Sequence, residues 1–131
     1  MEAIEALRIL YKEQYNIDEV MVELMSDRDI LHLTASGTSN KSISTFLNID
    51  ADEIARVNKI FYGFDGWIVD LDINPMTVYS NMTKLGYFDY ETFRNELDLL
   101  SPYYEEDQIK LIFEVCSKFK TIEKLLEEEW N

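Results

Sequence analysis

Apolar side chains recur every three or four residues along most of this 131-residue chain, and this spacing constrains its fold most strongly. An α-helix has about 3.6 residues per turn, so residues three and four apart share one face. One stripe near the C-terminus contains Ile109, Ile112, Phe113, Cys116 and Phe119. The chain has only four glycines and two prolines, which disfavours an all-β fold with many tight turns. We therefore expect a single all-α domain of about six or seven helices.

Capping residues divide the periodic pattern into separate helices. Asn74-Pro75 and Asp89 are typical of helix starts, because Asn and Asp side chains accept hydrogen bonds from the first free N–H groups. Ser26 to Asp29 resembles a capping box, so we expect one helix to end at Met25 and another to begin at Ser26. The helical pattern covers residues 2–15, 17–25, 26–37, 41–47, 51–62, 75–86, 89–100 and much of 101–131.

Residues 39–62 have the apolar spacing of a helix-turn-helix corner. A short helix is followed by a turn at Asn48-Ile49-Asp50 and by a second helix that Asp50 caps. Helices joined in this way present the second helix to DNA in many proteins. Any tight corner of helices needs the same apolar spacing, so packing within the protein is the simpler role. The expected inward positions are Ile43, Phe46, Leu47, Ile49, Ile54, Val57, Ile60 and Phe61.

The charge of the chain opposes a DNA-binding role for this corner. The net charge is −14, whereas DNA binding depends on cationic side chains that replace counterions along the phosphates. Residues 39–62 contain three acidic and three basic side chains, and the second helix opens on Asp50, Asp52 and Glu53. If the corner does bind DNA, the expected contacts are Lys41, Ser42, Ser44, Arg56, Asn58 and Lys59.

Residues 66–73 differ from the rest because their apolar positions alternate with a period of two. Trp67, Val69, Leu71 and Ile73 occupy one side of this pattern, which is typical of an extended chain. The sequence offers no second strong pattern of this kind to pair with it. We therefore expect an extended strap over the helical core, and the alternative is a strand that pairs with another chain.

No catalytic or metal-binding motif stands out. Asp70, Asp72 and Asn74 have the spacing at which a calcium loop begins, but Pro75 stands where that loop needs glycine. His32 is the single histidine, so a cluster of histidine ligands cannot form. The single cysteine, Cys116, lies on an apolar stripe, where a buried and unreactive thiol is the usual state. We expect no enzyme activity, no metal and no cofactor.

Aromatic residues make up 13% of the chain, and exposed Trp and Tyr side chains are enriched in protein–protein interfaces. We therefore expect the chain to bind other assembly proteins and to form a homo-oligomer, for which a ring is one possible arrangement. The acidic N-terminus lacks the pattern of a signal peptide, and the lone cysteine fits a reducing compartment. The residues expected to contact partners are Trp67, Tyr103, Tyr104, Glu127, Glu128, Glu129 and Trp130.

In size, helical class and acidic charge, the chain resembles viral head–tail connector (adaptor) proteins. This resemblance implies a non-enzymatic assembly protein of the virion or the host cytoplasm, with residues 127–131 as a docking tail. Through residues 39–61 the chain also resembles viral small terminase subunits, which implies a ring that recognises DNA. A transcription regulator or an acidic DNA mimic is a further alternative.

Overall fold

The protein is all-helical throughout the part that our computed structural model describes, which comprises residues 9, 13 and 17–127. This confirms the expected fold class, and these residues form no β-strand. The expected helix 2–15 falls almost entirely outside the described residues, as do Glu128, Glu129 and Trp130 of the expected docking tail. The helices are α2 (Ile17–Ala35), α3 (Asn40–Leu47), α4 (Ala51–Tyr62), α5 (Pro75–Lys84), α6 (Tyr90–Leu100) and α7 (Glu106–Glu127).

Helix α2 is continuous where two helices were expected. The boundary predicted at Ser26 is wrong, because the apolar spacing runs through it: Leu24, Ile30 and Leu31 are all buried on the same helix. Asp29, which should have completed the capping box, is exposed and lies 3.8 Å from the Arg28 guanidinium. Burial of a continuous apolar face therefore outweighs the local capping signal.

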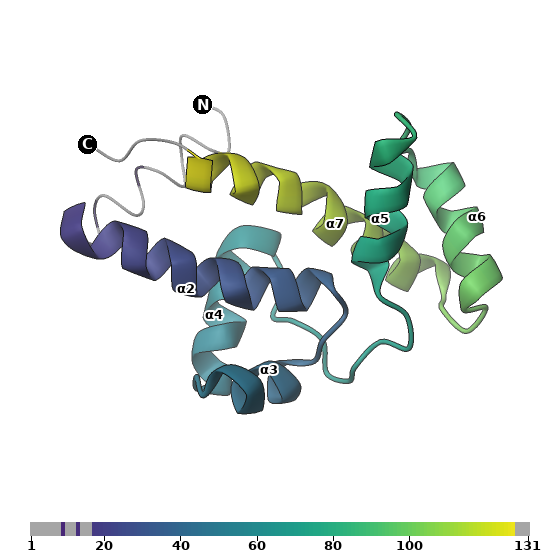
Figure 1. The fold of residues 1–131 in the computed structure, drawn as a ribbon. Helices are drawn as coiled ribbons and strands as arrows, with labels where there is room; N and C mark the ends of the chain where they lie inside the picture. Colours follow the sequence, from purple (N-terminus) through teal and green to yellow (C-terminus); the bar gives the residue numbers. More distant parts are fainter. Residues whose placement is uncertain (1–8, 10–12, 14–16, 128–131) are drawn as a thin grey trace.

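Helix α7 holds the molecule together (Figure 1). It contacts α2 and α4 along one part of its length and α5 and α6 along the other. The molecule thus has two regions on one central helix: the corner region, formed by α2, α3 and α4, and the hairpin region, formed by α5 and α6. The buried side chains of α7 are Ile109, Ile112, Val115, Cys116, Phe119 and Ile122.

Both helices of the hairpin region begin where the capping residues predicted. The Asn74 carboxamide oxygen accepts a hydrogen bond from the Met76 N–H at 2.9 Å, at the start of α5. The Asp89 carboxylate accepts one from the Thr92 N–H at 2.9 Å, at the start of α6. Beneath them Phe93 is fully buried. The core of this region is a set of aromatic rings in contact with one another, Tyr79, Phe88, Tyr90, Phe93 and Phe113.

The spacing of Phe93, Leu97 and Leu100 predicts that all three face the core, but this prediction is wrong for Leu100, because 63% of its surface is exposed. Phe93 and Leu97 fill the inward side of α6. Leu100 instead continues a neighbouring row with Thr92 and Glu96, at intervals of four residues, and this row faces a groove against α5.

The chain crosses from α4 to α5 through residues 64–74, which contain no regular secondary structure. This segment contains the extended strap expected at 66–73. The Trp67 indole is only 6% exposed, and its Nε1 donates a hydrogen bond to the Thr34 carbonyl at 2.8 Å. The Leu71 N–H donates to the Gly37 carbonyl at 2.7 Å. Val69, expected to face inward with Trp67, is 68% exposed, since the backbone bends at this point and breaks the alternation.

The longest described helices, α2 and α7, lack the continuous apolar surface needed to cross a bilayer, and the same holds for every other helix in the described residues.

Candidate interaction surfaces

The turn between α3 and α4 is built by local hydrogen bonds around buried isoleucines. Asn48 ends α3 in the left-handed conformation, with φ of 56°. The Ser44 hydroxyl donates to the Ile49 carbonyl at 2.6 Å, which closes the turn. Ile43 and Ile54 are fully buried on the two sides of it. These contacts explain why the two helices pack together, and they assign no ligand to the corner.

The six side chains expected to contact DNA do not form one cationic face. Asn58 is fully buried, and its Nδ2 donates to Asn40 Oδ1 at 3.3 Å, so the prediction that it reaches DNA is wrong. The Arg56 Nε donates to the Glu53 carboxylate at 2.9 Å, and this pairing lowers the pKa of Glu53. Ser42 donates to Asp70 at 2.9 Å. Ser44 is held in the turn, whereas Lys41 and Lys59 are exposed.

The residues expected to contact partners also separate. The prediction that Trp67 contacts a partner is wrong, because its indole is buried and holds the strap onto α2. Tyr104 is half-buried and its hydroxyl donates to the Asp72 carboxylate, so it has a structural role. Tyr103 is 82% exposed and remains a candidate for a contact. Glu127 ends α7, and the rest of the expected tail falls outside the described residues.

Asp70 and Asp72 fasten the strap at its two sides. Asp70 accepts hydrogen bonds from the Ser39 N–H at 2.7 Å and from the Ser42 hydroxyl, which attaches the strap to the start of α3. Asp72 accepts from the Ser101 hydroxyl at 2.7 Å and from Tyr104, which attaches it to the end of α6. These hydrogen bonds hold the pKa of both carboxyls below the ordinary value of 3.8.

The partners of Asp70, Asp72 and Asn74 all differ, so the three do not converge as the opening of a calcium loop would. Asn74 caps α5 instead. Across the described residues, no group of three or more His, Cys, Asp or Glu side chains is placed to hold a metal ion. Cys116 is fully buried, and burial raises the pKa of its thiol to about 12, which keeps it protonated and unreactive near neutral pH.

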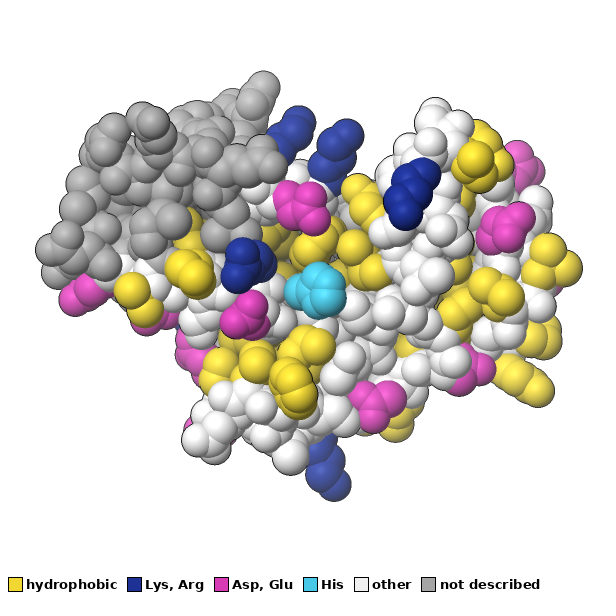
Figure 2. Space-filling view, viewed as in Figure 1, with side chains coloured by type: hydrophobic (Ala, Val, Ile, Leu, Met, Phe, Trp, Pro, Cys, Tyr) yellow, Lys and Arg dark blue, Asp and Glu magenta, His cyan; other side chains and the backbone are white. Residues whose placement is uncertain are grey.

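His32 lies on the open face shown in Figure 2, where it is the cyan side chain. Its ring centroid lies 5.9 Å from that of Phe119 in an edge-on contact. The hollow around it, of about 730 Å³, is also lined by Arg28, Asp29 and Glu123. The charges in this hollow are of both signs and select no particular ligand.

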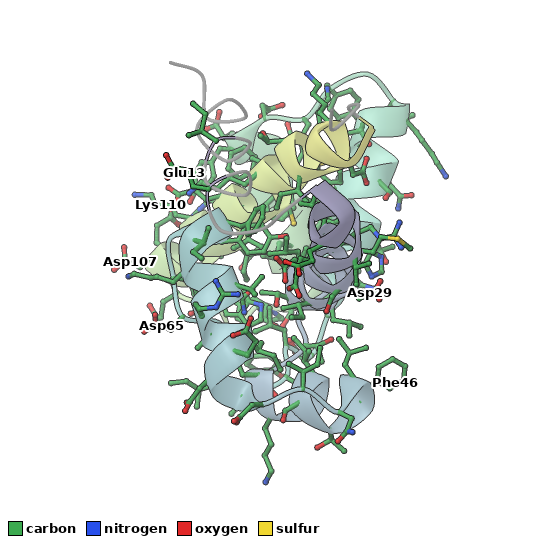
Figure 3. The ribbon with its side chains drawn as sticks, turned by 90° about the vertical axis from the view of Figure 1, so that its left-hand side faces the viewer. Glu13, Asp29, Phe46, Asp65, Asp107 and Lys110 are labelled. Atoms are coloured by element: carbon green, nitrogen blue, oxygen red, sulfur yellow. The ribbon has the colours of Figure 1, made fainter. Side chains whose placement is uncertain are left out.

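The first candidate interaction surface lies on the corner region, and we call it the corner surface. Phe46, Ile68 and Val69 are 77%, 93% and 68% exposed, and all three line one open hollow of about 750 Å³. Figure 3 shows Phe46 pointing away from the body of the molecule. The prediction that Phe46 faces the core is wrong, and Ile43 and Leu47 face the core from this helix instead. The polar side chains that line the hollow of the corner surface include Lys41 and Asp70.

The second candidate surface is the α5–α6 groove, a narrower hollow of about 340 Å³ between these two helices. Its floor is formed by the buried Val78 and Met82. Its walls include the exposed side chains of Leu85 and Leu100, at 67% and 63%, and Tyr87 at 48%. Apolar side chains gather over both this region and α3 in Figure 2.

Sequence patterns missed both surfaces. Ile68 lies on the polar side of the period-two pattern, and Leu100 matched an inward position, so neither stood out as an exposed apolar residue. Large exposed apolar residues matter when they are contiguous in space, and that requires the fold. No protein-family model, curated protein or solved structure matches the chain.

Proposed function

We propose that this chain is a non-enzymatic helical assembly protein that acts through contacts with copies of itself and with other proteins. The observation that supports this most directly is the corner surface. Single exposed apolar residues are common on soluble proteins, but a contiguous group marks an interaction site. Phe46, Ile68 and Val69 form such a group around one hollow.

We assign the corner surface to self-association because of its charge. Two copies that each carry a net charge of −14 repel one another, so they meet most easily through the least charged part of the surface. Phe46 belongs to residues 39–62, which contain three acidic and three basic side chains, whereas Ile68 and Val69 belong to the strap. In a twofold contact each copy presents the same residues to the other. The lining of the hollow includes both a base, Lys41, and an acid, Asp70, which could pair across such a contact.

A ring-forming connector of a viral head–tail assembly is a different form of this proposal, because a ring needs a head-to-tail contact between two different patches. The number of copies in the oligomer distinguishes a twofold dimer from a ring. The DNA-binding alternative has less support. Of the side chains proposed to contact DNA, Asn58 is buried and Arg56 is paired with Glu53. The exposed Lys41 and Lys59 fall short of the roughly six or more basic contacts on which tight DNA binding usually depends.

The test is the mass of the oligomer in solution for the double variant Phe46→Asp with Ile68→Asp. We expect self-association to weaken by about tenfold or more, because two charges would enter the apolar contact. Sedimentation at several concentrations measures this effect, and circular dichroism checks that the helices persist. The matched control is Leu99→Asp with Val22→Asp, which adds the same two charges on side chains that are 80% and 67% exposed outside the corner surface. A wild-type chain that stays monomeric, or a double variant that associates normally, would refute the proposal.

A further inference from the structure

We infer that the α5–α6 groove binds a basic amphipathic helix of another protein. This inference deepens the proposed function and rests on it, because it names the kind of partner that the second surface accepts. It uses different residues from the corner surface, so the two can fail separately.

The shape of the groove suits a helix. Val78 and Met82 on α5 and Leu85 just after its end form one row, at intervals of four and three residues. Thr92, Glu96 and Leu100 form a second row along α6. The two helices contain 10 and 11 residues, so each row follows a helix about 15 Å long, which matches about three turns of a partner helix. Peptides also bind by adding a strand to a sheet, but the described residues contain no strand to extend.

The groove is partly filled by its own side chains but not closed. Val78 and Met82 are 5% and 3% exposed, so a partner in the groove contacts only the small part of each side chain that faces the opening. Leu85 and Leu100 keep most of their surface in water. A partner with apolar side chains on one face would cover these walls and remove apolar surface from water on both sides.

The charge of the groove selects between two occupants. Glu96 is the one charged side chain among the described residues that line it. Arg94, on the same helix, donates to the Glu106 carboxylate at 2.6 Å, so its charge is already compensated. Residues 75–100, which form the hairpin region, contain four acids and two bases, a net charge of −2. A second copy also carries −14 and is repelled, whereas a helix with Lys or Arg beside its apolar face is attracted.

The probe for this inference is a fluorescently labelled synthetic helix of about 12 residues, with leucines on one face and lysines beside them. Its charge-reversed copy carries glutamates in place of the lysines. Fluorescence anisotropy of the full chain with each peptide measures affinity. We expect the lysine peptide to bind at least about tenfold more tightly than the glutamate peptide.

The variant Leu100→Glu distinguishes binding in the groove from a general attraction between a negative protein and a cationic peptide. This substitution makes the chain more acidic while it removes an apolar wall, so we expect affinity for the lysine peptide to fall by about tenfold. The matched control, Leu99→Glu, adds the same charge one residue away and outside the groove lining. It should leave affinity unchanged or slightly higher.

The role of Glu96 is tested in the same way. Glu96→Gln should weaken the lysine peptide by about threefold and reduce the salt dependence of binding. Glu91→Gln makes the same chemical change on α6 outside the groove lining and should have a smaller effect. Equal effects of these two substitutions would show that Glu96 does not meet the cation.

Three further results would overturn the inference. Wild-type affinity of Leu100→Glu for the lysine peptide would show that charge alone holds it. Tight binding of the glutamate peptide would remove the selection for a base. A lower oligomer mass for Leu100→Glu, with the mass of Leu99→Glu unchanged, would identify a second copy as the occupant. In each case the corner variant still tests self-association independently.

Discussion

The corner surface and the α5–α6 groove both expose large apolar side chains, but they differ in charge and in depth. The hollow of the corner surface is lined by one base, Lys41, and one acid, Asp70, and Figure 3 shows Phe46 projecting away from the molecule. The groove is recessed between two helices, and Glu96 lines it. In a chain of net charge −14 this difference matters, because a neutral face tolerates a second acidic copy while an acidic face favours a basic partner.

They also differ in how the sequence builds them. The groove comes from one helical hairpin, whose two helices form its walls. The corner surface joins α3 to the strap, and Phe46 shares a hollow with Ile68 and Val69 because Trp67 and Asp70 hold the strap in place. The groove therefore depends on hairpin packing, and the corner surface depends on the strap.

The largest effect that we expect comes from the core beneath the groove. Phe93→Ala removes a fully buried ring that contacts Phe88 and Phe113, and it should lower the free energy of unfolding by about 3–5 kcal/mol. Urea unfolding measures this loss, and Ile43→Ala, at a fully buried site beneath the corner surface, is the matched variant. If the two regions share one core through α7, both variants unfold in a single transition. Amide exchange that speeds up in only one region would show that the regions are independent.

A smaller loss of stability should follow Gly66→Ala, which tests the dependence of the corner surface on the strap. A Cβ at this position would lie 2.1 Å from Asn40 Oδ1, and φ of +108° strains any other residue. We expect a loss of about 2 kcal/mol or more and a red shift of Trp67 fluorescence. The control is Gly86→Ala, where φ is +84° but no atom lies within 4 Å of the added Cβ. Equal losses for the two variants would argue against close packing of the strap.

Salt should move the two interactions in opposite directions. Raising it from about 0.05 M to about 0.5 M shortens the Debye length several-fold. The lysine peptide should then bind the groove several-fold more weakly, because salt screens its attraction to Glu96 and to the net negative charge of the chain. Self-association should strengthen, because the repulsion between two acidic copies is screened as well. Anisotropy and sedimentation on the same samples measure both, and a shift in the same direction would remove the distinction between the surfaces.

The smallest effects should come from the two carboxylates that fasten the strap. Asp70→Asn should speed amide exchange at Ser39, whose N–H donates to Asp70, while Asp72→Asn should loosen the attachment to Ser101 and Tyr104. Hydrogen exchange followed by NMR, residue by residue, distinguishes these local effects. Loosening of both attachments by either variant would show that the strap moves as one unit.

The two carboxylates also predict a dependence on pH. The folded pKa of each lies below the ordinary 3.8, so the unfolded chain takes up protons first as the pH falls. The stability that these carboxylates contribute is complete well above pH 3.8 and is lost as the pH falls through the folded pKa. The difference in unfolding free energy between the wild type and each Asn variant should therefore shrink below about pH 4. A difference that stays constant at acid pH would contradict this assignment.

Local signals in the sequence predicted two helix starts together with their capping contacts, whereas Asp50 stands at the start of α4 but its side chain makes no capping hydrogen bond. Asn74-Pro75 and Asp89 lie where the first N–H groups of α5 and α6 need acceptors, and these contacts involve only neighbouring residues. The capping signal at Ser26 failed because the burial of Leu24 and Leu31 depends on other helices. Local chemistry therefore fixes a helix start only when the buried face does not continue through it.

The orientation of individual apolar residues was harder to predict. Phe46 and Leu100 occupy rows adjacent to the inward row of their helices, so the spacing alone could not show which row faces the core. Trp67 was assigned to a partner because of its residue type, although its indole has a partner within the protein. The two surfaces arise from such choices between adjacent rows, and these depend on where the other helices lie.

The central position of α7 limits how this protein can be dissected. Its buried residues Ile112 and Phe119 belong to a core to which both the corner region and the hairpin region contribute. A fragment that ends before α7 would leave the apolar faces of α2 and α5 in water, so neither surface can be excised as an autonomous peptide. Studies of one surface without the other will need point substitutions in the intact chain, and transplanting residues 39–62 onto another scaffold would have to supply a substitute for this helix.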